Sequence, residues 1–164
     1  MNITLIQPFT GGVDIEPPKS LACISAALDK AGHEIRLIDL QQCKVREKWE
    51  AIFTSGPTDL VGISSMTPQV NDAHDIARRV KELAPGVPVI LGGVHATLLP
   101  MQTLREFPFF DILVVGEGEH TIVELASRLE RGEKYADVSG IAYRMDGKET
   151  ATPPRPRITN LDSL

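Results

Sequence analysis

Residues 61–97, VGISSMTPQVNDAHDIARRVKELAPGVPVILGGVHAT, contain one complete strand–helix–strand unit. Val61–Ser64 and Val87–Leu91 are almost continuously apolar, which is typical of parallel strands buried on both faces. Between them, apolar residues recur at spacings of three and four and predict a helix: Val70, Ala73, Ala77, Val80, Leu83 and Ala84. Pro85-Gly86 ends this helix. The stretch therefore predicts two parallel strands joined by a crossover helix.

The same alternation continues on both sides of this unit. Further strand candidates are Ile3–Ile6, Ile35–Asp39 and Ile112–Val115, and further helix candidates are Leu21–Ala31, Glu47–Phe53 and Ile122–Leu129. Five strand–helix repeats predict an α/β fold with a doubly wound five-stranded parallel sheet. We expect the flavodoxin-like (Rossmann-like) order 2-1-3-4-5 with right-handed crossovers, over a domain of residues 1–136.

The pattern changes beyond Asp137. Residues 137–152 predict a β-hairpin, because Ile141–Arg144 and Lys148–Thr150 flank the tight-turn pair Asp146-Gly147. Residues 153–164 begin with three prolines in four positions and predict an extended linker that leads out of the domain.

Composition narrows the class of protein. A chain of 164 residues with 42% hydrophobic and 24% charged residues fits one soluble domain. The net charge of −5 argues against a nucleic-acid-binding face and against a polybasic membrane anchor. The two cysteines, Cys23 and Cys43, have no zinc or disulfide spacing, and we expect a reducing cytoplasm. We see neither a signal peptide nor an apolar run of membrane-spanning length.

Four loops follow the carboxyl ends of the predicted strands, where ligands bind in such sheets. They are Gln7–Ser20, Ser64–Val70, Gly92–Thr97 and Gly116–Glu119. Glycines permit close approach of a ligand to the backbone, and hydroxyls offer neutral hydrogen bonds, which suits a large and mostly uncharged ligand. Ordinary turn and cap chemistry explains any one loop alone better than a ligand does, and four such loops on one rim shift the balance toward a ligand. The candidate cofactor-binding residues are Thr10, Gly11, Gly12, Ser64, Ser65, Met66, Thr67, Gly92, Gly93, His95, Gly116, Glu117 and Gly118, and we assign no catalytic or metal-ligating residue.

Other common occupants of this fold match these loops poorly. A phospho-acceptor receiver needs an acidic residue at the end of the third strand, where this chain has Ser64-Ser65. A dinucleotide fingerprint follows the first strand, whereas Gly116-Glu117-Gly118 follows the fifth. Glu117 and Glu119 would repel a pyrophosphate, and both are placed favourably at the N-terminus of the helix that follows. Thr10-Gly11-Gly12 matches the phosphate-binding loop of flavin proteins only weakly.

Several motifs together resemble the N-terminal domain of cobalamin-dependent radical S-adenosylmethionine (SAM) enzymes. They are Pro17–Leu21, Val61–Thr67, Gly92–Thr97, Gly116–Glu119, and the closing segments Gly140–Arg144 and Asn160–Leu164. The resemblance implies a cobalamin whose nucleotide tail enters the crevice of the sheet. By position it implies that Ser64, Ser65 and Thr67 contact the tail, and that Gly92, Gly93 and His95 line its channel. It implies that Gly116, Glu117 and Gly118 lie near the corrin.

This family includes methyltransferases and ring-forming cyclases, and their radical barrel carries a 4Fe-4S cluster and S-adenosylmethionine. Many corrinoid domains place a cobalt-ligating histidine after the first strand, but residues 7–20 contain none. The resemblance therefore implies base-off cobalamin without a histidine lower ligand. Cys23 and Cys43 cannot form the cluster motif C-x-x-x-C-x-x-C, so we expect a module that is not catalytic alone and partners a barrel of the same polypeptide. Two alternatives stay open: a corrinoid-free docking domain of the same fold, and an unrelated flavodoxin-like nucleotide binder.

Overall fold

The computed structural model describes residues 1–9 and 17–159 of the chain. Its strands are β1 (Asn2–Gln7), β2 (Glu34–Asp39), β3 (Leu60–Ser64), β4 (Val89–Gly92), β5 (Ile112–Val114), β6 (Ile141–Met145) and β7 (Lys148–Ala151). Its helices are α1 (Lys19–Lys30), α2 (Cys43–Arg46), α3 (Trp49–Thr54), α4 (Val70–Leu83), α5 (Val94–Leu98), α6 (Pro100–Glu106), α7 (Glu119–Glu130) and the 3-10 turn η1 (Thr67–Gln69).

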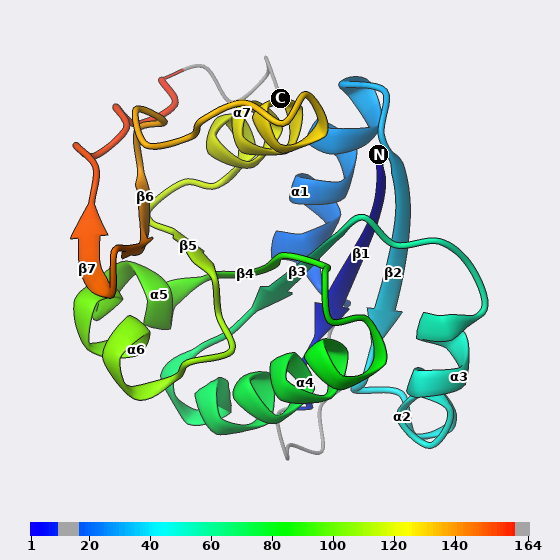
Figure 1. The fold of residues 1–164 in the computed structure, drawn as a ribbon. Helices are drawn as coiled ribbons and strands as arrows, with labels where there is room; N and C mark the ends of the chain where they lie inside the picture. The colour runs from blue at the N-terminus through cyan, green and yellow to red at the C-terminus, as the bar shows by residue number, and fades with distance from the viewer. Residues whose placement is uncertain (10–16, 160–164) are drawn as a thin grey trace.

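Within these residues the strands form one mixed sheet in the order β2-β1-β3-β4-β5-β6-β7 (Figure 1). Strands β1 to β5 pair in parallel, as an α/β fold requires. The sequence analysis predicted the hairpin as an extension outside a five-stranded sheet. In the structure the hairpin joins the sheet, because β6 pairs antiparallel with β5, from Val114↔Ile141 to Ile112↔Tyr143. This pairing covers the edge of β5 that a five-stranded sheet would leave open. Asp146 and Gly147 turn the hairpin with φ of 53° and 75°.

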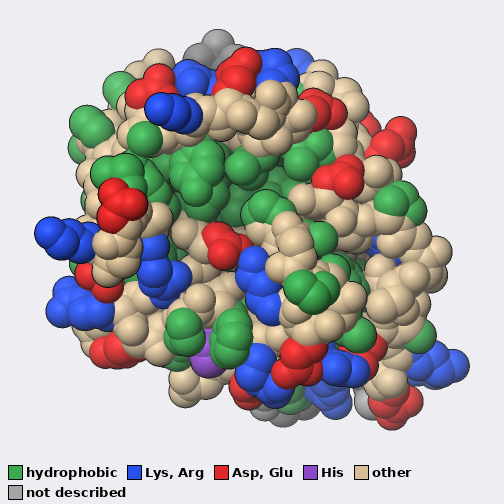
Figure 2. All heavy atoms as spheres, in the orientation of Figure 1, with side chains coloured by type: hydrophobic (Ala, Val, Ile, Leu, Met, Phe, Trp, Pro, Cys, Tyr) green, Lys and Arg blue, Asp and Glu red, His purple; other side chains and the backbone are tan. Residues whose placement is uncertain are grey.

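The alternation of side chains along each strand supplies two apolar layers. Ile3 and Leu5 of β1 belong to the layer covered by α1 and α7. Ile6 belongs to the opposite layer, with α4, α5, α6 and the α3 residue Phe53. Figure 2 shows apolar side chains in the hollow between α7 and strands β4 and β5, with charged side chains around it. In the described part of the chain, no helix is long and apolar enough to cross a bilayer.

The connection from β4 to β5 differs most from the expectation. The sequence analysis expected a loop at Gly92–Thr97 and named no helix between it and Ile112, whereas α5 and α6 occupy Val94–Leu98 and Pro100–Glu106. Both helices are short, and Val94 and Thr97 are β-branched, so their pattern gives no clear helical period. Pro100 begins α6 at a position where proline is tolerated.

Arg144 of β6 binds the end of this connection. Its guanidinium donates to the carbonyl of Phe110 over 2.6 Å and to that of Phe107 over 3.0 Å, and it also donates to Leu104. Leu104 lies in the last turn of α6, and Phe107 and Phe110 follow its end. Carbonyls at the end of a helix lack intrahelical donors.

We expect Arg144→Met to lower the free energy of unfolding by about 2–4 kcal/mol, because several acceptors lose a charged donor at once. Urea unfolding of this variant beside Arg105→Met measures the effect, since Arg105 is exposed on α6. Equal stability of the two variants would show that the carbonyls do not depend on Arg144.

Candidate functional site

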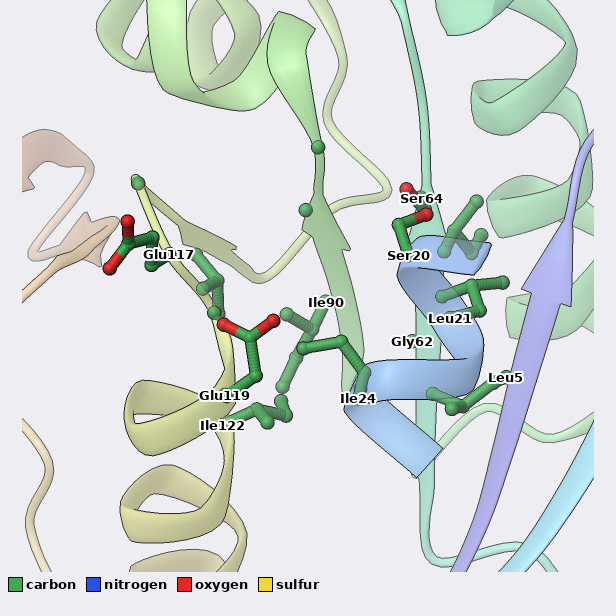
Figure 3. A pocket seen from close by; sticks show the side chains of 16 residues that line it. Leu5, Ser20, Leu21, Ile24, Gly62, Ser64, Ile90, Glu117, Glu119 and Ile122 are labelled. Atoms are coloured by element: carbon green, nitrogen blue, oxygen red, sulfur yellow. The ribbon is translucent and has the colours of Figure 1, made fainter. Parts of the chain in front are cut away.

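A pocket of about 200 Å³ lies between the sheet and helices α1 and α7, at the carboxyl ends of the strands (Figure 3). Strands β1, β3, β4 and β5 form its floor, and the first turns of the two helices form its walls. Its lining residues are Leu5, Ser20, Leu21, Ile24, Gly62, Ile63, Ser64, Ile90, Gly92, Gly93, Val114, Gly116, Glu117, Gly118, Glu119 and Ile122. The lining is mainly apolar, with hydroxyl groups and carboxylates contributed at a few positions.

Gly62 makes room in the floor of the pocket. A Cβ atom at this position would lie 2.7 Å from Cδ2 of Leu5, which is closer than real Cβ contacts. Leu5 and Gly62 are direct partners in the pairing of β1 with β3. A side chain at residue 62 would therefore displace Leu5, which itself lines the pocket.

The Gly92-Gly93 turn joins two of the loops at the rim. Gly93 has a φ of 93°, and a Cβ there would lie 2.6 Å from the backbone oxygen of Ser65 and 2.9 Å from its nitrogen. Ser65 in turn donates its N–H to the carbonyl of Gly92 over 3.1 Å, and its own carbonyl accepts from His95 N over 3.2 Å. The backbones after β3 and β4 can pack this closely only because residue 93 has no side chain.

The N-terminus of α7 forms the opposite part of the rim. Gly116 has a φ of 85°, and its N–H donates to the hydroxyl of Thr97 over 3.1 Å. A Cβ at Gly118 would lie 3.1 Å from Cδ1 of Ile24, so this glycine lets α7 approach α1. In Figure 3 the Glu119 side chain extends toward Ile90 and Ile24, whereas Glu117 points away from them.

The structure brings together six of the thirteen predicted residues. Ser64, Gly92, Gly93, Gly116, Glu117 and Gly118 line the pocket. Ser65, Met66, Thr67 and His95 are not among its lining residues, so any contact of theirs with a cofactor stays a prediction. The Met66 side chain is 53% exposed. Ser65 is buried, and its hydroxyl donates to the Met66 carbonyl. Thr10, Gly11 and Gly12 lie outside the described residues.

His95 has local partners that account for its position. Its side chain is only 5% exposed, Nδ1 lies 3.2 Å from the Thr67 hydroxyl, and the ring packs edge-on against Phe107 with centroids 6.3 Å apart. This environment belongs to the α4–α6 side of the sheet, away from the α1–α7 pocket. The expectation that His95 lines the tail channel therefore has no support from this geometry.

The sequence analysis missed the walls of the pocket. The candidate residues omitted ten that line it, of which Ser20 and Glu119 lie in the selected loops and the other eight do not: Leu5, Ser20, Leu21, Ile24, Gly62, Ile63, Ile90, Val114, Glu119 and Ile122. One signal was present: Gly62 interrupts an otherwise apolar strand, and an isolated glycine in a strand often marks a close approach. The helix residues gave no such signal, because apolar positions on α1 and α7 fit simple core packing equally well.

Two buried histidines, His33 and His95, and the half-buried His74 make stability depend on pH. Burial is the main cause that lowers the pKa of His33, His74 and His95 below the ordinary 6.5. Just below that value the unfolded chain binds more protons than the folded chain, so the free energy of unfolding falls as the pH drops through it.

We expect urea unfolding to show a decline between about pH 7 and pH 5.5, above the range in which carboxylates titrate. His74→Phe should reduce the decline, because His74 packs among Phe107, Phe109 and Phe110 and its Nε2 has no partner. His120→Phe is the control at an exposed position. A decline of equal size in all three proteins would contradict the assignment to buried imidazoles.

The chemistry of the pocket is that of binding. Its apolar floor and walls suit a flat or branched apolar group, and its glycine rim admits a larger ligand to the backbone. Among the described residues, no three His, Cys, Asp or Glu side chains are grouped so as to hold a metal ion. The volume of about 200 Å³ is smaller than the roughly 300–1,000 Å³ typical of sites for whole drug-sized ligands, so the pocket fits a part of a large ligand.

Known proteins are similar to this chain over most of its length. The B12 binding domain family matches residues 13–126. The chain is 35% identical over 149 residues to an uncharacterized methyltransferase of Pyrococcus horikoshii, covering 90% of this chain and 32% of that protein. It is 34% identical over 179 residues to the anaerobic magnesium-protoporphyrin IX monomethyl ester cyclase of Rubrivivax gelatinosus, covering 100% of this chain and 32% of the cyclase.

Among solved structures, the fold is similar to the radical S-adenosylmethionine methyltransferase TsrM from Kitasatospora setae, solved with cobalamin and a 4Fe-4S cluster bound. The TM-score is 0.82 at 22% sequence identity, and the match covers 98% of this chain and 30% of TsrM. At this identity the likeness shows a shared fold. The chain spans about a third of the length of these relatives.

Proposed function

Because the chain belongs to the B12 binding domain family, we propose that it is the cobalamin-binding module of a larger radical SAM enzyme. The observation that carries the proposal is the pocket between the sheet and the first turns of α1 and α7. We assign the nucleotide tail of cobalamin to this pocket and the corrin to the glycine-rich rim above it.

The residues of the pocket fit that tail. Its terminal base is a flat, apolar bicyclic group, and Leu21, Ile24, Ile90 and Ile122 offer it apolar walls. Apolar surface transferred from water into such walls contributes roughly 25 cal/mol per Å². The hydroxyls of Ser20 and Ser64 stand at the same pocket and can donate to polar atoms of the tail. The mouth lies at the strand ends, where this fold class binds its ligands.

Bound cobalamin would supply a cobalt centre able to carry a methyl group, and this chain's residues would hold and orient it. We further propose that a radical SAM domain of the same polypeptide performs methyl transfer or cyclisation with a 4Fe-4S cluster and S-adenosylmethionine. In this proposal residues 1–136 are the binding domain, residues 137–152 extend it, and residues 153–164 link it to the radical domain in the cytoplasm.

We also propose that the cobalamin is base-off and has no histidine ligand below the cobalt. Residues 7–20 contain no histidine, and a base held in the pocket cannot also bind cobalt. We expect the electron paramagnetic resonance spectrum of the reduced cobalt(II) complex to lack superhyperfine splitting from an axial nitrogen. Such splitting would contradict the proposed state.

Reconstitution with hydroxocobalamin tests the function itself. We expect the folded chain to retain the corrinoid through a desalting column, with the visible spectrum reporting one bound molecule per chain. Complete loss of colour from the folded protein would favour the corrinoid-free docking domain. Tight retention of flavin in a parallel column would favour the nucleotide binder.

A further inference from the structure

The segment Thr152–Ile158, here called the tail strap, folds back from β7 along the N-terminal half of α7. Its backbone first pairs with the chain before β6, where Gly140 N donates to the Pro153 carbonyl over 2.9 Å. A Cβ at Gly140 would lie 3.3 Å from Cβ of Arg155, so the two segments pack closely. At its far end, Ile158 N donates to Glu117 Oε2 over 2.6 Å. The strap therefore connects the hairpin to a residue of the pocket rim.

Arg155 anchors the middle of the tail strap. Its Nε donates to the Thr121 hydroxyl over 2.9 Å, and its Nη2 forms an ion pair with Glu124. The Arg155 side chain is 24% exposed, and Thr121 is buried. The prolines at 153, 154 and 156 have no backbone N–H to donate and hold the strap extended. The anchor on α7 therefore depends on one arginine side chain.

Glu117 is where the tail strap meets the pocket. The residue lines the pocket, yet its carboxylate points away from Ile90 and Ile24 in Figure 3 and accepts the Ile158 N–H. It lies between Gly116 and Gly118, which leave the backbone on both sides conformationally permissive. In the described part of the chain, the hydrogen bond from Ile158 N–H is the contact that holds this carboxylate away from the mouth.

We propose that the docked tail strap is a latch that holds the Glu117 carboxylate out of the pocket mouth, with Arg155 as its positioning residue. Released, the carboxylate adds a second negative charge beside Glu119, and like charges repel an anionic ligand. The inference rests on the proposed function for its ligand, because the nucleotide tail of cobalamin carries a phosphate. Strap docking and cobalamin binding are then positively coupled, and each strengthens the other by the same factor.

The latch itself is tested without any ligand. In the tail strap, trypsin can cut after Arg157, whereas the Arg155–Pro156 bond resists it, so cleavage between Arg157 and Ile158 reports strap release. We expect Arg155→Gln to accelerate this cut about tenfold or more, and to speed amide exchange at Ile158, because local opening exposes both. Arg131→Gln is the control, since Arg131 pairs with Glu133 near the other end of α7. Unchanged cleavage and exchange in Arg155→Gln would overturn the latch.

The coupling is tested with hydroxocobalamin titrated into four proteins: wild type, Arg155→Gln, Glu117→Gln and the double variant. We expect Arg155→Gln to weaken binding about tenfold when Glu117 is present and to have no effect in the Glu117→Gln background. Hydroxocobalamin should also slow the cut after Arg157 in wild type. Equal loss in both backgrounds, or equal affinity of wild type and Arg155→Gln, would overturn the coupling. Faster cleavage of Arg155→Gln with no binding to any variant would overturn the proposed function and leave the latch standing.

Discussion

Gly62→Val should reduce the affinity for hydroxocobalamin at least about 100-fold, a loss of roughly 2.8 kcal/mol of binding free energy. The new Cβ meets Leu5 Cδ2 at 2.7 Å, so Leu5 has to move, and both side chains then occupy the floor of the pocket. The pocket then has too little room for the part of the ligand that it is proposed to hold. The fold should survive, because valine favours strands and overpacking typically costs about 1–3 kcal/mol.

Gly86→Val is the matched control, since Gly86 lies in the turn after α4 and a Cβ there meets nothing within 4 Å. Calorimetric titration of both variants measures the affinities, and urea unfolding confirms that each is folded. Wild-type affinity in a folded Gly62→Val protein would place the ligand elsewhere.

Gly93→Ala should cost about 3–4 kcal/mol of stability, near the upper end for single substitutions. The φ of 93° is strained for alanine, and the added Cβ would lie 2.6 Å and 2.9 Å from the backbone oxygen and nitrogen of Ser65. Backbone atoms cannot turn aside as a side-chain end can, so the loops after β3 and β4 must separate. Binding should fall as well, because these loops form the rim of the pocket.

Gly92→Ala provides the comparison one residue earlier. Gly92 lines the same pocket, but a Cβ there meets nothing within 4 Å and its φ lies outside the left-handed region. We expect its free energy of unfolding to stay within about 1 kcal/mol of wild type. Similar losses for both variants would show that the close approach at Gly93 is not what joins the two loops.

The sequence predicted the part of the fold that rests on local periodicity. The unit around Val61–Ser64 and Val87–Leu91 forms β3, α4 and β4 as expected, because each apolar run is buried between two layers. The pairing of β6 with β5 could not be read this way, since it depends on contacts far apart in the sequence. The helices α5 and α6 were too short to show a period.

The site was predicted at its rim and missed at its walls. The rule that ligands bind at the carboxyl ends of parallel strands selected Ser64, Gly92 and Gly116, which do line the pocket. It gives no information about which face of the sheet the pocket lies under. Leu21 and Ile24 look like core residues from sequence. His95 comes three residues after Gly92, the last residue of β4, but packs on the face of the sheet opposite the pocket.

The comparison of cobalamin with cobinamide, which has the corrin but no nucleotide tail, tests the central claim most directly. The account predicts that the chain binds hydroxocobalamin at least about 100-fold more tightly than diaquacobinamide, because only cobalamin can fill the pocket under α1 and α7. It also predicts that Gly62→Val removes most of this difference. Equal affinity of the wild-type chain for the two corrinoids would contradict it.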